Sequence, residues 1–279
     1  MKLRINDTET EFSLEREESL ADVLHSVDSW LEHESHILTG VRVNGTDIPA
    51  EELEQAGARD IHEIETLEIK AVHWVTIYRE ALVQTASILA LPEQERPANW
   101  AASPAESFLL VRDRELHDIV AQAIDTSNAP EAGEKTSAEM AGTLVHARMA
   151  ETEHPEEALT VLVRNVEELI PLLENLPLSL QTGNDAEASA TLSRFVRTAE
   201  SLIRLVPLLK AAGVPVDSML VDNKAFPSWI EELLGVLTEL VEGYTNGDII
   251  LVGDLAEYEI APRLAALAPA LDALAPGRA

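Results

Sequence analysis

The stretch from Phe226 to Leu274, FPSWIEELLGVLTELVEGYTNGDIILVGDLAEYEIAPRLAALAPALDAL, decides the fold of the larger part of this chain. Apolar residues recur every three or four positions on both sides of Asn246-Gly247-Asp248, which is the spacing of amphipathic helices. Gly247 can adopt the left-handed conformation that ends a helix, and Asp248 can accept hydrogen bonds from the free N–H groups of the next one. The stretch therefore predicts two antiparallel helices joined by a tight turn.

A second stretch, at about residues 155–212, follows the same plan. A shift of 64 positions places Thr182-Gly183-Asn184 on Asn246-Gly247-Asp248. One helical hairpin cannot bury its apolar face alone, so the hairpins at about 155–212 and 226–275 predict a bundle built from both. Internal duplication and chance similarity between amphipathic hairpins both explain the match, and the sequence leaves the two open.

The N-terminal part alternates apolar and polar residues, as strands do. Leu3 and Ile5 predict a first strand, and Thr10–Leu14 predicts a second. A helix is expected after Ser19, and further strands flank the Asn44-Gly45 turn and end near Val72. This order of elements resembles that of ubiquitin-like β-grasp domains.

The β-grasp resemblance implies a fold for residues 1–72 and raises one activity. Sulfur carriers and ubiquitin-like modifiers of that kind act through a free C-terminal Gly-Gly. Here the last strand ends at Lys70-Ala71-Val72 and the chain continues, so a carrier role is not expected. The whole sequence predicts an α+β protein, with a small β-grasp-like domain at 1–72 and an all-helical bundle domain at 73–279.

Composition limits the classes of partner. The chain has 279 residues, 50 of them acidic and 20 basic, and a formal net charge of −30. Such a charge repels nucleic acid and anionic membranes, so neither is an expected partner. The chain has no cysteine and no apolar run long enough to cross a bilayer, which favours a cytoplasmic protein. Adaptation to a salty cytoplasm and biased composition explain the acidity equally well.

One concentrated basic surface is predicted in this acidic chain. Helical spacing places three arginines on one face of the second helix of the 155–212 hairpin, and another precedes them on the first helix: Arg194, Arg197, Arg204 and Arg164. A guanidinium group pairs with carboxylates in a fork, so these residues are a candidate docking surface for an acidic partner. Pairing with carboxylates of the chain itself is the plainer alternative.

A polar cluster is expected on the last helix, at Asp254, Glu257, Tyr258 and Glu259. Carboxylates in a helical bundle can bind metal, but a di-metal bundle needs Glu-x-x-His on two helices. The only such spacing runs from Glu151 to His154. No motif for a phosphate loop, a dinucleotide, a catalytic serine or a zinc protease is present. We therefore predict no catalytic residue, cofactor or metal, and the carboxylates near Asp254 remain an alternative ligand-binding or enzymatic site.

The pattern Asn-Gly-Asp followed by Asp-Leu-x-Glu-Tyr-Glu-x-x-Pro-x-Leu, at residues 246–264, is similar to a segment of uncharacterised bacterial proteins. Those proteins also have a β-rich start followed by helices. The resemblance implies a bacterial protein and supplies no active site. Together these observations favour a non-enzymatic interaction or scaffolding protein that binds another protein, and they leave its oligomeric state open.

Overall fold

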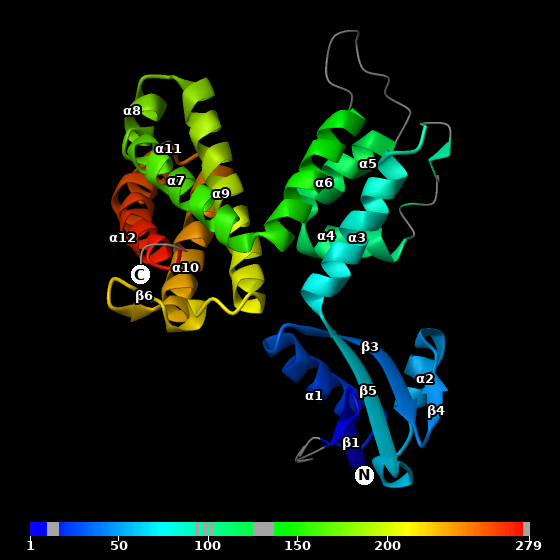
Figure 1. Cartoon of the computed structure of the whole chain (residues 1–279). Coiled ribbons are helices and arrows are strands. Elements are labelled where there is room, and N and C mark those ends of the chain that lie inside the picture. The colour runs from blue at the N-terminus through cyan, green and yellow to red at the C-terminus, as the bar shows by residue number, and fades with distance from the viewer. Residues whose placement is uncertain (10–16, 93–94, 97–99, 101–102, 125–136, 276–279) are drawn as a thin grey trace. The chain divides into compact units, whose positions relative to one another are not determined.

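The computed structural model has an α+β architecture, which confirms the predicted fold class (Figure 1). It describes residues 1–9, 17–92, 95–96, 100, 103–124 and 137–275. The chain divides into two compact units, Met1–Gln84 and Thr85–Ala279. The division falls inside helix α3, Trp74–Leu89, whereas the sequence placed the domain boundary at residues 72 and 73.

The first unit contains a five-stranded mixed sheet and short helices. In chain order its elements are β1 (Lys2–Ile5), β2 (Thr8–Glu9), α1 (Leu20–His33), β3 (His36–Val43), β4 (Thr46–Ile48), α2 (Leu53–Gly57), β5 (Thr66–His73) and the first part of α3. The strand order is β2-β1-β5-β3-β4, in which β1 and β5 are parallel and the other neighbours are antiparallel. The strand predicted at Thr10–Leu14 lies outside the described residues.

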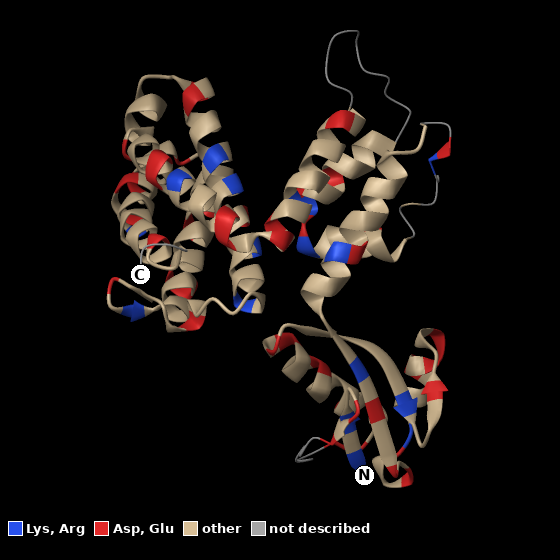
Figure 2. Ribbon diagram, in the orientation of Figure 1, with Lys and Arg blue, Asp and Glu red and all other residues tan. Residues whose placement is uncertain are grey.

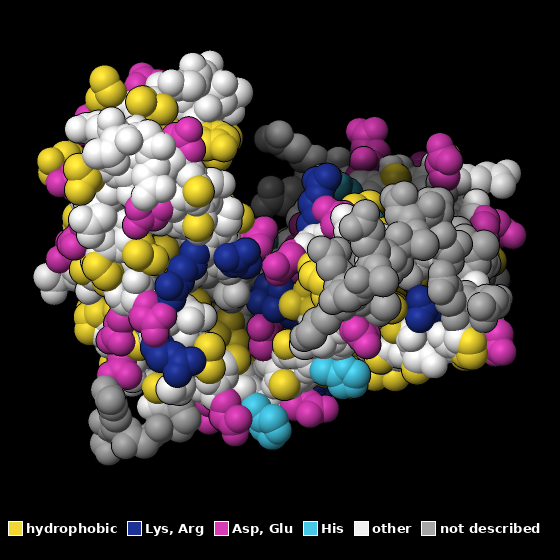
Figure 3. Space-filling view, turned by 90° about the horizontal axis from the view of Figure 1, so that it is seen from above, with side chains coloured by type: hydrophobic (Ala, Val, Ile, Leu, Met, Phe, Trp, Pro, Cys, Tyr) yellow, Lys and Arg dark blue, Asp and Glu magenta, His cyan; other side chains and the backbone are white. Residues whose placement is uncertain are grey.

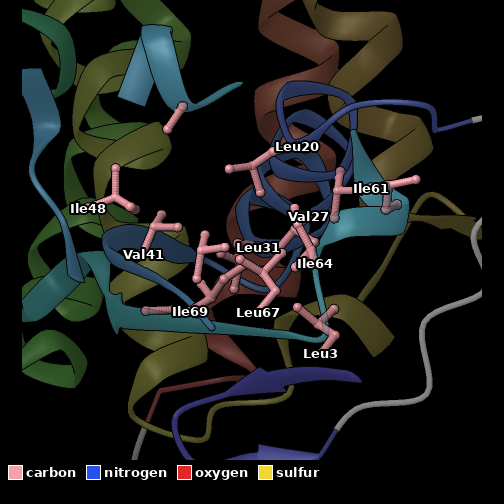
Figure 4. Packing of buried hydrophobic residues seen from close by; sticks show 14 residues of the cluster. Leu3, Leu20, Val27, Leu31, Val41, Ile48, Ile61, Ile64, Leu67 and Ile69 are labelled. Atoms are coloured by element: carbon pink, nitrogen blue, oxygen red, sulfur yellow. The ribbon is translucent and has the colours of Figure 1, made fainter. Parts of the chain in front are cut away.

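The core of this unit forms between α1 and one face of the sheet (Figure 4). Leu20, Val27 and Leu31 of α1 point toward Leu67 and Ile69 of β5 in the central layer. Alternation along each strand sends the intervening residues to the opposite face. The exposed face of the sheet is therefore made of the even-numbered residues of β1 and β5 and, after the register shift between Leu38 and Gly40, of Gly40 and Arg42 in β3.

Local sequence signals hold the ends of these elements. Ser19 caps α1 by accepting a hydrogen bond from the backbone N–H of Asp22, whose carboxylate accepts in return from the N–H of Ser19. Asn44 and Gly45 both have positive φ, the conformation that a tight hairpin turn requires. The predicted capped helix and hairpin turn are both present.

In its described residues the second unit is helical apart from one short hairpin. After α3 its elements are α4 (Pro104–Arg112), α5 (Arg114–Ile124), α6 (Ser137–Glu153), α7 (Pro155–Glu174), α8 (Leu176–Gln181), α9 (Asp185–Ala211), β6 (Leu220–Val221), β7 (Lys224–Ala225), α10 (Phe226–Thr245), α11 (Ile249–Asp254) and α12 (Ala261–Asp272). A π-helical segment, Leu255–Ile260, joins α11 to α12 without a break.

The turns of both predicted helical hairpins have the same geometry. Gly183 after α8 has φ 74°, and Gly247 after α10 has φ 70°. The next N–H in each turn, of Asn184 or Asp248, donates to a carbonyl five residues earlier, which is the bond that closes a Schellman motif. Asp248 then caps α11 by accepting from the N–H of Leu251 at 3.0 Å, as its position in the sequence predicts.

Helix α7 is central to the packing of the second half of this unit. It packs against α9 on one side and against α12 on the other, and its buried residues include Leu159, Val166 and Leu173. Helix α10 packs mainly against α11 and the π-helical segment. The backbones of α9 and α10, both fully described, approach each other closely at few points. This spacing between α9 and α10 creates the site considered next.

Candidate functional site

Helices α9 and α10 each carry a row of apolar side chains in addition to the residues they bury. The row on α9 is Leu192, Val196, Ala199 and Ile203, and the row on α10 is Ile230, Leu234, Leu237, Val241 and Tyr244. Members of each row are alternately three and four residues apart, so each row follows one side of its helix. This repeat is the one by which helices pack side by side.

The two rows line a common groove, which we call the α9–α10 groove. At one end Ile203 faces the groove from α9 and Leu234 from α10, with Val166 and Leu264 among the deeper residues. The other end is a cavity of about 430 Å³, walled by Val196, Val241 and Tyr244 among others. The first of these cavities is small, about 30 Å³, and the buried side chain of Phe195 lines both.

The walls of this groove expose large apolar side chains. Val196 is 52% exposed, Ile203 58%, Val241 64% and Tyr244 66%. Single exposed apolar residues are normal on protein surfaces, but several that converge on one depression are typical of a binding site. Figure 3 shows hydrophobic side chains lying among charged ones on the face of the molecule that it draws.

Charged residues directly follow several members of the two rows in the sequence. Glu231 and Glu242 each directly follow a member of the α10 row, and Arg197 and Glu200 each follow a member of the α9 row. Glu115 of α5 also lines the wide end of the groove. The rim defined by these five residues has four carboxyl groups and one guanidinium group, so a basic ligand fits it better than an acidic one.

The four arginines that the sequence predicts on one basic surface have different partners and different exposure in the structure. Arg204 is 8% exposed and its guanidinium group binds the carboxylate of Glu151 on α6 through two nitrogens, at 2.8 and 3.1 Å. Arg194 pairs with Glu168 on α7. Arg164 and Arg197 are exposed and form no ion pair within the described part of the chain. Arg204 is therefore not available at the surface to an acidic partner.

Arg148 of α6 is the centre of the buried charge network that includes Arg204. Its three guanidinium nitrogens contact Asp113 at 2.8 Å, Glu115 at 2.7 Å and Glu151 at 3.2 Å. Asp113 also caps α5 by accepting from the N–H of Leu116. The network ties α5, α6 and α9 together by charge rather than by apolar contact. Both arginines and Asp113 are buried, so loss of Arg148 would remove a cationic partner from a buried carboxylate.

Glu200 lies beside this network, and its pKa is raised. Partial burial is the main cause, and the nearby carboxylates of Glu115 and Asp113 act in the same direction. Arg204 and Arg148 act in the opposite direction and do not offset the effect of burial.

The predicted polar cluster lies on the outside of the bundle. Asp254 is exposed, and Tyr258 is exposed on the π-helical segment. A hydrogen bond from its hydroxyl to the carboxylate of Glu257 raises the pKa of Tyr258. Glu259 pairs with Arg263 one turn later. In the described residues no three histidine, aspartate or glutamate side chains converge as metal ligands do.

Sequence reasoning missed the α9–α10 groove because it treated all apolar residues of these helices as core. The sequence contained a signal for the groove. The two heptad-spaced rows of α9 and α10 hold nine apolar residues, which is more than the core of one bundle requires. The rows extend beyond the faces that pack on α7, α11 and α12. Only the spacing of the two helices shows that the surplus faces a groove.

Comparison with known proteins gives uncharacterised families. Residues 1–73 match the family model described as the TP0873 N-terminal domain, and residues 157–269 match a domain of unknown function, DUF8042. The second match covers α7 to α12, which contain all but Glu115 of the groove and rim residues.

A protein of Treponema pallidum (strain Nichols), described as an uncharacterized protein, is similar to part of this chain. The two are 32% identical over 90 residues, which is 32% of this chain and 44% of the Treponema protein. The chain therefore aligns with less than half the length of that relative. No solved structure matches. None of the described helices combines the length and the apolarity needed to cross a membrane.

Proposed function

We propose that the protein is a non-enzymatic protein-interaction module whose α9–α10 groove binds an amphipathic helix of a partner protein. The observation that carries this proposal is the pair of heptad-spaced apolar rows that line one groove from opposite sides. A helix with apolar residues at the same spacing would complete a three-helix seam there. This mode of binding, a helix in an apolar groove, recurs among peptide-binding proteins.

Burial of the exposed groove residues would supply the affinity. Moving a valine or leucine side chain from water into an apolar contact stabilises a complex by about 1.5–3 kcal/mol. More than half of each of four side chains is still exposed, so a partner can bury it: Val196, Ile203, Val241 and Tyr244. A few such residues usually dominate an interface, since most contacts around them contribute little.

The rim charges specify the kind of helix. Four carboxyl groups and one guanidinium group flank the groove, and the chain as a whole has a net charge of −30. A partner helix with lysine or arginine beside its apolar face would meet favourable charge along both walls, whereas an acidic helix would be repelled. The proposed ligand is therefore a basic amphipathic helix.

The alternative, a ligand-binding or enzymatic bundle that uses the carboxylates near Asp254, has less support. Glu259 and Tyr258 are engaged with neighbours on their own helix. Asp254 and Tyr258 are exposed, and neither lines the α9–α10 groove. The π-helical geometry is the single feature that favours a function there, since such segments are frequent at functional sites.

A model peptide tests the proposed groove. The probe is a labelled 18-residue peptide of leucine and lysine with leucine at heptad a and d positions. A peptide of the same composition in scrambled order is the comparison. In about 0.15 M salt we expect the amphipathic peptide to bind the full chain and the scrambled one to bind at least about tenfold more weakly, by fluorescence anisotropy.

Two double variants locate the binding. Val196→Asp with Val241→Asp should weaken binding by about tenfold or more, because both walls lose apolar contact. The matched control, Val111→Asp with Leu178→Asp, changes the charge equally at exposed sites outside the groove and should stay within about twofold of the wild type. Equal losses in both variants would contradict the proposal. A concentration-dependent dimer that the groove variant dissociates would instead assign the groove to a second copy of the chain.

A further inference from the structure

The exposed face of the five-stranded sheet carries a row of alternating charges. One residue from each strand contributes, in cross-strand register: Glu9, Arg4, Glu68, Arg42 and Asp47, from β2, β1, β5, β3 and β4. Residues in register point to the same face, and the buried neighbours Leu3, Leu67 and Val43 show that this face is the outer one.

Basic residues gather on this face although the domain is strongly acidic. Residues 1–72 contain 18 acidic and six basic residues, and four of the six basic ones are outer-face strand residues: Lys2, Arg4, Arg42 and Lys70. The described acidic residues of α1 and of the short helices after β4 lie elsewhere. Figure 2 shows this separation, with Lys and Arg on β1, β3 and β5.

Only one of these four cations is neutralised by its neighbours. Arg42 donates to Asp47 at 2.9 and 3.2 Å and to Glu68 at 3.3 Å, and the bonds to Asp47 are the main reason that the pKa of Arg42 is raised. Lys2, Arg4 and Lys70 are exposed and form no ion pair within the described residues of this unit. Lys2 and Arg4 thus lie on β1, the strand next to that of Glu68, and Lys70 lies on β5 itself.

We infer that this sheet face binds an acidic segment of a partner protein. Charge complementarity carries the inference: Lys2, Arg4 and Lys70 form no ion pair within the described residues, and acidic surfaces of the same unit would repel such a segment from other faces. Carboxylates lie in register between the cations. An acidic peptide, whose charges are separate, fits this arrangement better than a continuous phosphate backbone does. This interaction goes beyond the proposed helix binding, because it uses a different unit and a ligand of opposite charge.

A labelled 12-residue peptide of alternating glutamate and serine is the probe, with the full chain at about 50 mM salt. We expect binding that weakens steeply as salt rises, because the contacts are exposed ion pairs. Lys2→Gln, Arg4→Gln and Lys70→Gln together should weaken binding about tenfold. The glutamate versions of these three substitutions should abolish it, and thermal unfolding of both variants shows whether the sheet remains folded.

The matched control removes three other exposed arginines, through Arg59→Gln, Arg112→Gln and Arg114→Gln. It should bind within about twofold of the wild type. If the control loses binding and the sheet variant keeps it, the acidic ligand binds elsewhere and the inference is wrong. Absence of binding by the wild type, or tighter binding of a 12-nucleotide single-stranded RNA than of the peptide, would also overturn it. The leucine–lysine peptide reports on the groove independently, so the two proposals can fail separately.

Discussion

Buried charge in the helical unit is stable because each buried ion has a specific partner. Arg148 reaches carboxylates on α5 and on its own helix, and Glu151 is shared between Arg148 and Arg204. Such pairs contribute less net stability than apolar packing, since both ions lose their water. Their geometric demands are strict, however, so the network fixes the register of α6 against α9.

His117 of α5 is a second charged position with partners on both ring nitrogens. Its Nε2 lies 2.8 Å from the carboxylate of Glu106 on α4, and its Nδ1 lies 2.9 Å from that of Asp118. Burial alone would lower the pKa of His117, but the hydrogen bonds to Asp118 and Glu106 outweigh it and the pKa is raised above 6.5. The folded protein therefore holds a proton here that the unfolded chain releases more easily.

This shift predicts a pH dependence of stability. A raised folded-state pKa contributes stability that is fully present below about pH 6.5 and is lost as the pH rises through the folded pKa. The free energy of unfolding of the wild type should exceed that of His117→Gln by about 1–3 kcal/mol at pH 5.5, the range for hydrogen bonds to charged groups. Urea unfolding of the wild type and of His117→Gln at pH 5.5 and 8.5 measures this difference. A difference that does not shrink at the higher pH would contradict the assignment.

At the scale of elements, prolines do not simply end helices in this chain. A proline removes a backbone donor and crowds the preceding turn, yet α7, α9 and α12 continue through Pro171, Pro207 and Pro269. Pro177 lies in the first turn of α8, where no backbone donor is needed, and Pro262 lies two residues after the π-helical segment. Tertiary packing of the long helices stabilises them enough to tolerate a missing hydrogen bond.

Three glycines test why each position needs glycine. Gly247 has φ 70°, so Gly247→Ala should destabilise the protein by about 1 kcal/mol. In Gly253→Ala the new methyl would lie 3.2 Å from Pro177, which predicts a loss through crowding between α11 and α8. Gly235 lies in α10 with nothing within 4 Å of a methyl group, so Gly235→Ala should stabilise by about 0.5–1 kcal/mol. In thermal unfolding, Gly247→Ala and Gly253→Ala should therefore melt below the wild type, and Gly235→Ala should melt above it.

At the scale of the whole molecule, net charge dominates behaviour in solution. A formal charge of −30 on 279 residues makes the folded state repel itself, and most ion pairs on the surface contribute little against this repulsion. The two proposed binding surfaces use the charge differently. The groove has an acidic rim that suits a basic helix, whereas the sheet face is a basic island for an acidic segment.

Salt should therefore stabilise the protein. At about 1 M monovalent salt the Debye length is about 3 Å, which screens most carboxylate repulsion. We expect the thermal midpoint to rise between about 20 mM and 1 M sodium chloride, measured by calorimetry. A midpoint that stays flat or falls would mean that internal pairs already neutralise the carboxylates.

The sequence by itself determined the features that depend on neighbours in the chain. The Ser19 cap, the Asn44-Gly45 turn and the left-handed glycines at 183 and 247 follow from the backbone preferences of single residues. The alternating and helical spacing of apolar residues was enough to predict the fold class. Each spacing gathers the apolar residues on one face in only one type of element, a strand or a helix.

The tertiary structure alone decided the features that depend on residues far apart. Arg204 has its carboxylate partner 53 positions away on another helix, so no local pattern could separate it from Arg194 and Arg197. The groove exists because α10 packs on α11 rather than on α9, a choice set by packing of the whole unit. Helical periodicity identifies an apolar face, but it does not say whether another helix of the same chain covers that face.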